Sequence, residues 1–190
     1  MFAAKLMEAD WEIELGGDAP VIDACWPGFV DLRRFPNRIV ELPEISQLPE
    51  LRASLLRLND VHASPVWTSK CDVWPVTDFD ALELDAKIED ARYGVACYID
   101  LLPRSDQQWT LPKMAIAACE KFCLQLRSVP LTCCRADLIV RRAFITPELE
   151  DFGITAYLTA CGCDEDTAAV HLGGALAAFA DSVVPSPDAA

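Results

Sequence analysis

The alternation of hydrophobic and polar positions is clearest in the second half of the chain. Over residues 95–102, apolar side chains recur at every second position, which predicts a strand. From residue 112 to residue 126 they recur every three or four positions, which predicts a helix that Thr110 caps and in which Pro112 lies in the first turn.

The remainder of this half predicts a hairpin and a second helix. Residues 131–145 and 153–160 have the pattern of strands, and Thr-Pro-Glu at 146–148 marks a turn, so we expect the two strands to pair antiparallel. Asp164 is expected to cap a last helix, and the tail at 185–190 is expected to be frayed.

The first half shows similar patterns less regularly. Residues 11–15 alternate and precede a glycine-rich turn, which predicts an additional N-terminal strand, and residues 65–76 predict a long strand. Ser46 is expected to cap a helix between them. The apolar side of that helix would consist of Leu48, Leu51, Leu55 and Leu58.

An acidic segment separates the two halves. Residues 78–90 contain six acidic side chains and one basic side chain, Lys87. A short strand near 79–86 followed by an exposed connector is expected, and a helix fits the pattern nearly as well.

Short segments of the first half recur in the second half in the same order. Residues 29–32 resemble residues 98–101, and residues 65–72 resemble residues 130–137, at offsets of 69 and 65 positions. Common order and similar offset indicate an internal duplication. The alternative is that two β-α-β stretches look alike only because both follow the same hydrophobic pattern.

These elements predict an α+β fold with two tandem β-α-β-β-type units, a mainly antiparallel sheet and helices packed on one face. The units are expected at residues 1–77 and 93–184, joined by an acidic connector or edge strand at 78–92, in one compact pseudo-symmetric domain. The arrangement is similar to a doubled ferredoxin-like fold, an analogy of architecture that carries no function.

Charge and composition disfavour several classes of partner. The 190 residues include 16 basic and 30 acidic side chains, a net charge of −14, which argues against nucleic acid and anionic membrane surfaces. The N-terminal segment lacks the layout of a signal peptide, and the longest charge-free apolar stretch, residues 167–180, is shorter than the roughly 20 residues of a membrane-spanning helix. We therefore expect a cytoplasmic protein in which the nine cysteines are reduced.

Alternation along the strands places polar and aromatic residues on the sheet face that the helices leave uncovered. Each unit then presents an aromatic residue beside an acid, and a basic and an acidic residue two positions apart. The candidate ligand-binding residues are Tyr98, Asp100, Arg135, Asp137, Arg141, Tyr157, Asp31, Lys70 and Asp72.

Three interpretations of this face are open at the level of sequence. The polar residues can form the solvated side of the sheet, or the faces of two units or two subunits can pack together with their ions paired. The third interpretation is a cleft for a small molecule, in which Arg135 or Arg141 binds a carboxylate or phosphate group between aromatic walls.

Four cysteines lie near the expected hairpin. If its strands pair across a turn centred near residue 148, Cys134 lies opposite Cys163, with Cys133 and Cys161 close by, and four thiols could bind Zn²⁺. However, the spacing differs from the Cys-x-x-Cys pattern of zinc sites, and adjacent strand residues point to opposite faces. Core filling is therefore preferred over a metal or redox role, and no cofactor is expected.

No catalytic motif stands out. The two histidines, His62 and His171, are isolated in the sequence, and no glycine-rich phosphate loop is present. We therefore expect an acidic binding protein that recognises a partner protein or a second copy of itself through the polar and aromatic sheet face. The alternative is an enzyme or a small-molecule-binding protein with a cleft at that face for an anionic ligand.

Overall fold

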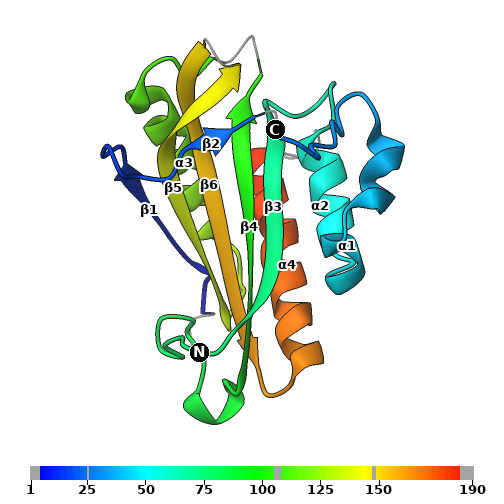
Figure 1. Cartoon of the computed structure of the whole chain (residues 1–190). Coiled ribbons are helices and arrows are strands. Elements are labelled where there is room, and N and C mark those ends of the chain that lie inside the picture. Colours follow the sequence, from blue (N-terminus) through cyan, green and yellow to red (C-terminus); the bar gives the residue numbers. More distant parts are fainter. Residues whose placement is uncertain (1–4, 25, 105–107, 147–148, 185–190) are drawn as a thin grey trace.

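The computed structural model of this chain describes residues 5–24, 26–104, 108–146 and 149–184. Six strands form one sheet in the order β1-β5-β6-β4-β3, and the short β2 also pairs with β5 (Figure 1). The long pairings β3–β4, β4–β6 and β5–β6 are antiparallel, whereas β1 and β2 run parallel to β5. The strands are β1 (Glu8–Glu14), β2 (Ile22–Asp23), β3 (Val66–Val76), β4 (Tyr93–Pro103), β5 (Cys134–Thr146) and β6 (Leu149–Gly162).

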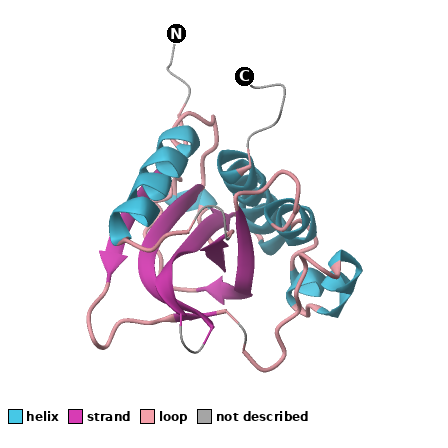
Figure 2. Cartoon of the chain, turned by 90° about the horizontal axis from the view of Figure 1, so that it is seen from above, coloured by secondary structure: helices cyan, strands magenta, loops and turns pink. Residues whose placement is uncertain are grey.

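The helices lie along one side of the curved sheet, as Figure 2 shows. Their apolar sides and the facing side chains of the strands form the main core, in which Phe179, Leu126 and Ile99 are almost completely buried. No helix within the described ranges is both long and apolar enough to cross a membrane. The helices are α1 (Glu44–Gln47), α2 (Leu51–Leu58), α3 (Pro112–Leu126) and α4 (Glu165–Val183), with 3₁₀ turns η1 (Pro36–Glu41) and η2 (Ile88–Asp90).

The α+β class is confirmed, and the sheet is mixed because the N-terminal strands pair parallel to β5. The expected β5–β6 hairpin is present, but its register places Cys134 opposite Ala160. The prediction that Cys134 faces Cys163 was therefore wrong by three residues, because β6 begins at Leu149 and not at residue 153. The expected turn at 146–148 lies partly outside the described residues.

Of the two N-caps predicted for the helices of the second half, one is confirmed and one is wrong. Asp164 caps α4, and its Oδ1 accepts a hydrogen bond from the Thr167 N–H at 2.7 Å, as expected. Thr110 does not cap α3, whose N-cap is Leu111.

The helix expected to begin at Ser46 is divided into α1 and α2, although its four leucines are buried. Pro49 causes the division, because a proline disfavours helical geometry in the preceding residue, and Leu48 is extended at φ −137° and ψ 88°.

Two segments that were expected to contribute to the sheet are not strands: residues 29–32, through their resemblance to the strand residues 98–101, and residues 79–86. Residues 29–32 follow the turn Trp26-Pro27-Gly28-Phe29, in which Gly28 adopts φ +98° and the Phe29 N–H bonds the Trp26 carbonyl. Residues 79–86 are loop and turn, so this part of the acidic segment is a connector and neither a strand nor a helix. The expected frayed tail at 185–190 lies outside the described residues.

The face opposite the helices is covered at one end by the segment that contains β2 (Figure 1). Ile22 and Ala24 of this segment pack with Trp67, Leu102 and Ala143 in a second apolar cluster. Gly153 on β6 permits this approach, because a Cβ at that position would lie 2.7 Å from the Ile22 Cδ1 and 2.9 Å from the Leu101 carbonyl oxygen.

The opposite end of the same face is covered by the connector between β3 and β4. Its Leu84 and Ala86 form a third apolar cluster with Cys161 of β6. Gly94 has a role similar to that of Gly153, because a Cβ there would lie 2.6 Å from the Phe79 ring and 2.7 Å from the Val76 carbonyl oxygen. The two covered ends leave the middle of the sheet face between them.

Candidate functional site

We call the uncovered middle of this face the open strip. It runs across the strands and comprises Asp72, Trp74, Tyr98, Arg135, Asp137, Tyr157 and Thr159, with Asp10 and Glu12 on β1. One register row crosses the whole sheet, from β1 through β5, β6 and β4 to β3. This central row is Asp10, Asp137, Tyr157, Tyr98 and Asp72. The structure therefore brings four of the predicted residues into one row.

Three aromatic rings form the middle of the open strip. The ring centroids of Trp74 and Tyr98 are 6.0 Å apart, those of Tyr98 and Tyr157 are 5.9 Å apart, and those of Trp74 and Tyr157 are 6.4 Å apart. Centroids at these distances belong to rings in direct contact, so no group fits between them. The three half-buried rings are therefore a platform on which a partner can lie, and not a cage around a ligand.

A buried polar network lies beside the platform. Asp100 and Arg141 are only 6% and 7% exposed. The Thr155 hydroxyl donates to the Asp100 Oδ1 at 2.6 Å, and the Arg141 Nη1 donates to the oxygens of Thr155 and Tyr157 at 3.3 Å each. Arg141 also donates to the Glu14 carboxylate at 2.7 Å. Each of these groups holds its neighbour in place beside the platform.

Burial affects the protonation of Asp100 in this network and of Tyr98 in the platform. It raises the pKa of Asp100, although the Thr155 hydroxyl and the positive charges of Arg141 and Lys70 act in the opposite direction. Burial and the nearby carboxylates of Asp100 and Asp72 raise the pKa of Tyr98 to about 12. Tyr98 is therefore a neutral phenol at physiological pH, suited to contact and hydrogen bonding and not to proton abstraction.

Both arginines that were expected to bind an anion already have carboxylate partners. The Arg135 Nε donates to the two Asp137 oxygens at 2.8 and 3.0 Å, and Arg141 pairs with Glu14. Because each guanidinium is engaged by a carboxylate of the same chain, an added anion would have to compete with that carboxylate.

Two predicted residues, Asp31 and Lys70, lie outside both the open strip and the polar network of Asp100 and Arg141. Asp31 is in the loop after β2, where Arg33 donates to both of its oxygens at 2.8 and 2.9 Å. Although burial acts in the opposite direction, these bonds and the charges of Arg33 and Arg34 hold the pKa of Asp31 below its usual value. Lys70 lies at a bulge of β3, and its Nζ is 5.5 Å from the Trp26 ring.

Sequence reasoning missed the contribution of β1. Its acidic side chains at alternate positions lie in register with β5, so that Asp10 is level with Asp137 and Glu12 with Ile139. The period of two in Glu8, Asp10, Glu12 and Glu14 was a visible signal that these carboxylates share one face. The neighbouring strand could not be identified from that pattern alone.

Two acids of the central row also protect the edges of the sheet. The Asp10 Oδ1 accepts from the Trp11 N–H, and the Asp72 Oδ1 accepts from the Val73 N–H, each at 2.8 Å. β1 and β3 end the strand order, so these bonds occupy backbone groups that an added strand would need. Pro75 further blocks the β3 edge, since it has no N–H.

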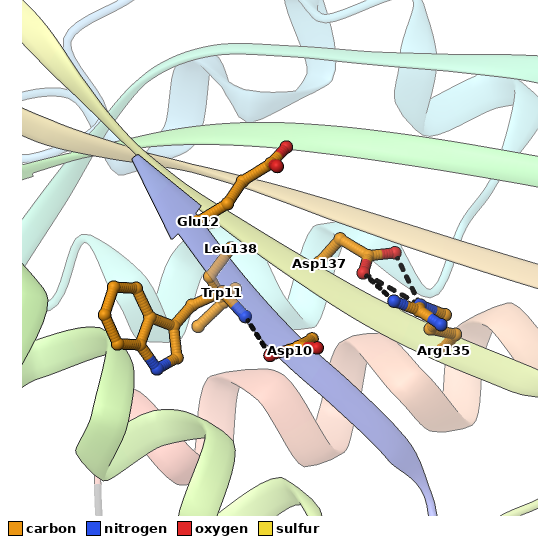
Figure 3. Close-up of a pocket in the computed structure, with 6 residues that line it drawn as sticks. All are labelled: Asp10, Trp11, Glu12, Arg135, Asp137 and Leu138. Atoms are coloured by element: carbon orange, nitrogen blue, oxygen red, sulfur yellow. Dashed lines mark hydrogen bonds and ion pairs between the residues drawn. The ribbon is translucent and has the colours of Figure 1, made fainter. Parts of the chain in front are cut away.

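A shallow cavity of about 230 Å³ lies where β1 meets β5 (Figure 3). In Figure 3, Glu12 and Trp11 project to opposite sides of β1, and the dashed lines mark the contacts between Arg135 and Asp137. The lining residues are Asp10, Trp11, Glu12, Arg135, Asp137 and Leu138. This volume is below the roughly 300–1,000 Å³ of typical small-molecule sites.

The four cysteines of the hairpin do not converge on one point. Cys134 points into the main core, whereas Cys161 and Cys133 belong to the cluster beneath the connector, on the other face. Cys163 is exposed and contacts Asp164 and Thr167. No group of three or more potential metal ligands occurs among the residues with described positions. The hairpin register and the alternation of faces therefore do not support the tetrathiolate zinc site, which the sequence analysis had ranked below core filling.

The open strip thus combines a rigid aromatic platform with carboxylates at both ends of its central row, and its arginines are internally paired. Such an arrangement can hold a positively charged partner by ring contact and charge. In comparisons with known proteins, no family model, curated protein or solved structure matches this chain.

Proposed function

We propose that this chain is a binding protein that recognises a basic segment of a partner protein through the open strip. The observation that carries the proposal is the contact of Trp74, Tyr98 and Tyr157 between the carboxylates of Asp72 and Asp137. Tyrosine and tryptophan are enriched at interface centres because they bury a large area and keep a polar atom available.

Charge complementarity favours a basic partner over a second copy of the chain. Within the described residues, Glu12 and Asp72 form no ion pair, whereas Arg135 and Arg141 each have one. Two copies packed face to face would bring these carboxylates together, and the net charge of −14 would add to the repulsion. A lysine- or arginine-rich segment would instead be attracted by these carboxylates, and its side chains could pack on the faces of the aromatic rings.

The second candidate is the binding of an anionic small molecule at the same face, with or without catalysis. It is favoured by one observation, the cavity that includes Arg135. The carboxylates of Asp10, Glu12 and Asp137 in the same lining disfavour an anion there, so we place this candidate second.

We also propose that the chain contains a duplicated unit, with segments 1–77 and 93–184 joined by the acidic connector at 78–92. Residues 65–72 and 130–137 lead into β3 and β5, and Asp72 and Asp137 at their ends both lie in the central row, one on each side of its two tyrosines. A doubled, ferredoxin-like unit would make these two acids equivalent in position, so Asp72→Asn and Asp137→Asn should both weaken partner binding. Asp137→Asn also releases the Arg135 guanidinium, which adds repulsion of a basic partner.

The binding proposal is tested with a nine-residue oligolysine peptide and calorimetry on the full chain. We expect binding that weakens with salt, and a loss of about 10-fold or more for Trp74→Ala. Phe35 is an exposed aromatic residue that does not belong to the open strip, so Phe35→Ala is the matched control. This variant should bind the peptide as the natural sequence does.

A charge control separates the strip from the general acidity of the protein. Glu12→Gln with Asp72→Asn should weaken oligolysine binding more than Asp18→Asn with Glu120→Gln, which changes the net charge equally at exposed sites elsewhere. Equal losses, or no binding of the peptide, would overturn the proposal. Binding of inorganic phosphate that is lost in Arg135→Ala would favour the anionic ligand, and a dimer that dissociates in Trp74→Ala would favour self-assembly.

A further inference from the structure

Two cysteines face each other where the connector covers the sheet. Cys133 directly precedes Cys134, which pairs with Ala160, and the Cys161 N–H donates to the Cys133 carbonyl oxygen at 2.9 Å. This backbone hydrogen bond holds the two residues side by side, as a disulfide requires, since its Cα atoms are about 4.4–6.8 Å apart.

The two side chains also meet. They pack in one cluster with Leu84 and Ala86. This pairing distinguishes them from Cys134, which lies on the other face, and from Cys163, whose sulfur contacts Asp164 and Thr167.

The backbone at Cys133 is unusual. Its φ of +61° is in the left-handed region, which is unfavourable for a residue with a Cβ. Residues held in such conformations cluster at functional sites, where the surrounding structure maintains the strain. Cys133 is half-buried and Cys161 is fully buried, so an oxidant dissolved in water reaches Cys133 first.

We propose that Cys133 and Cys161 form an oxidation site that closes to a disulfide in response to a hydroperoxide. The Cys133 sulfur attacks hydrogen peroxide, the O–O bond breaks, and one molecule of water leaves as the sulfenic acid forms. The Cys161 sulfur then attacks the Cys133 sulfur, the S–O bond breaks, and the displaced hydroxyl takes the Cys161 proton and leaves as a second water. One peroxide is reduced and two thiols are oxidised.

The disulfide would tie the residue just before β5 to the end of β6, directly beneath the connector. The cross-link is also two positions from Arg135 and Thr159 of the open strip, so it would restrain that end of the strip. The site does not depend on the proposed binding function, and its test uses chemical and thermal readouts that involve no partner.

The experiment treats the full chain with one equivalent of hydrogen peroxide, alkylates the remaining thiols and maps the peptides by mass spectrometry. We expect a linked Cys133–Cys161 pair with a mass lower by about 2 Da, reversed by a phosphine reductant. The oxidised chain should melt at a temperature about 5 °C or more above that of the reduced chain.

Variants make the result specific. Cys133→Ser and Cys161→Ala should abolish the linkage and the melting shift, whereas Cys163→Ser, at the exposed neighbouring thiol, should retain both. Cys133→Ser is decisive by itself if the buried Cys161→Ala variant fails to fold. Oxidation of Cys133 to sulfinic acid without a cross-link, or a linkage that includes Cys163 or Cys134 instead, would overturn the proposal.

Discussion

Tyr98 on β4 lies directly opposite Tyr157 on β6, and their ring centroids are 5.9 Å apart. Both strands are internal to the sheet, with β5 on one side and β3 on the other. The two tyrosines of the aromatic platform therefore stand on strands that are held by hydrogen bonds on both sides, whereas Trp74 is on the edge strand β3. Because the rings are already held in place, little conformational entropy is lost when a partner binds, and the binding free energy is more favourable.

Two substitutions distinguish the contribution of the Tyr157 hydroxyl from that of the Tyr157 ring. Tyr157→Phe removes the acceptor of the Arg141 Nη1 but keeps the ring, so we expect a loss of about 0.5–1.5 kcal/mol in the free energy of unfolding. Affinity for oligolysine should change less than about 2-fold, whereas Tyr157→Ala should weaken it by about 10-fold or more. Urea unfolding and calorimetry measure the two effects. Tyr93→Phe, at an exposed ring, serves as the control, and an equal effect there would contradict the role of the hydroxyl.

Asp100 predicts a pH dependence of stability. Its folded-state pKa is raised above the ordinary value of 3.8 by burial, so the charged form disfavours folding at pH above the folded-state pKa. This cost disappears as the pH falls towards the unfolded-state value. Asp100→Asn retains an oxygen for the Thr155 hydroxyl and should stabilise the protein at pH 7, with a smaller gain near pH 4.

Urea unfolding at several pH values tests this expectation, with Asp18→Asn as an exposed control. If Asp100→Asn were less stable than the natural sequence at pH 7, attraction to Arg141 and Lys70 would outweigh burial, and the folded-state pKa of Asp100 would lie below 3.8 and not above it.

The acids that cap the sheet edges predict a solubility effect. Asp10→Ala with Asp72→Ala frees the Trp11 and Val73 N–H groups on the two edge strands, so edge-to-edge association should increase. Light scattering against protein concentration measures it. Asparagine at both positions retains an acceptor oxygen and should associate less than alanine. Equal association of the alanine and asparagine variants would assign the effect to charge and not to capping.

The two glycines beneath the covering segments predict large stability losses. A Cβ at residue 153 or 94 would lie under 3 Å from a backbone carbonyl oxygen, so Gly153→Ala and Gly94→Ala should each cost about 1–3 kcal/mol in thermal or urea unfolding. Gly16→Ala meets nothing within 4 Å and should change stability by less than about 0.5 kcal/mol. A loss at Gly153 no larger than at Gly16 would show that the β2 segment does not pack on the sheet.

The periodic elements of the second half could be predicted from the sequence. The period of 3.6 in α3 and α4, the β5–β6 hairpin and the Asp164 cap are local properties, because each depends on residues close together in the chain. The period of two in β4, β5 and β6 likewise placed Tyr98, Asp137 and Tyr157 on one face before their neighbours were known. Gly28 after Pro27 was also a local signal, and it marked the turn where a strand was expected.

The sequence by itself thus determined which side chains share a face, because that follows from the backbone geometry of one strand. Only the tertiary structure decided that β1 lies parallel beside β5, that Arg135 and Arg141 are paired with acids, and that Cys134 lies opposite Ala160 and not Cys163. Most of these contacts join segments far apart in the chain. Their register depends on the turn between β5 and β6 and on the packing of the covering segments over Gly94 and Gly153, and a shift of one residue along a strand exchanges its two faces.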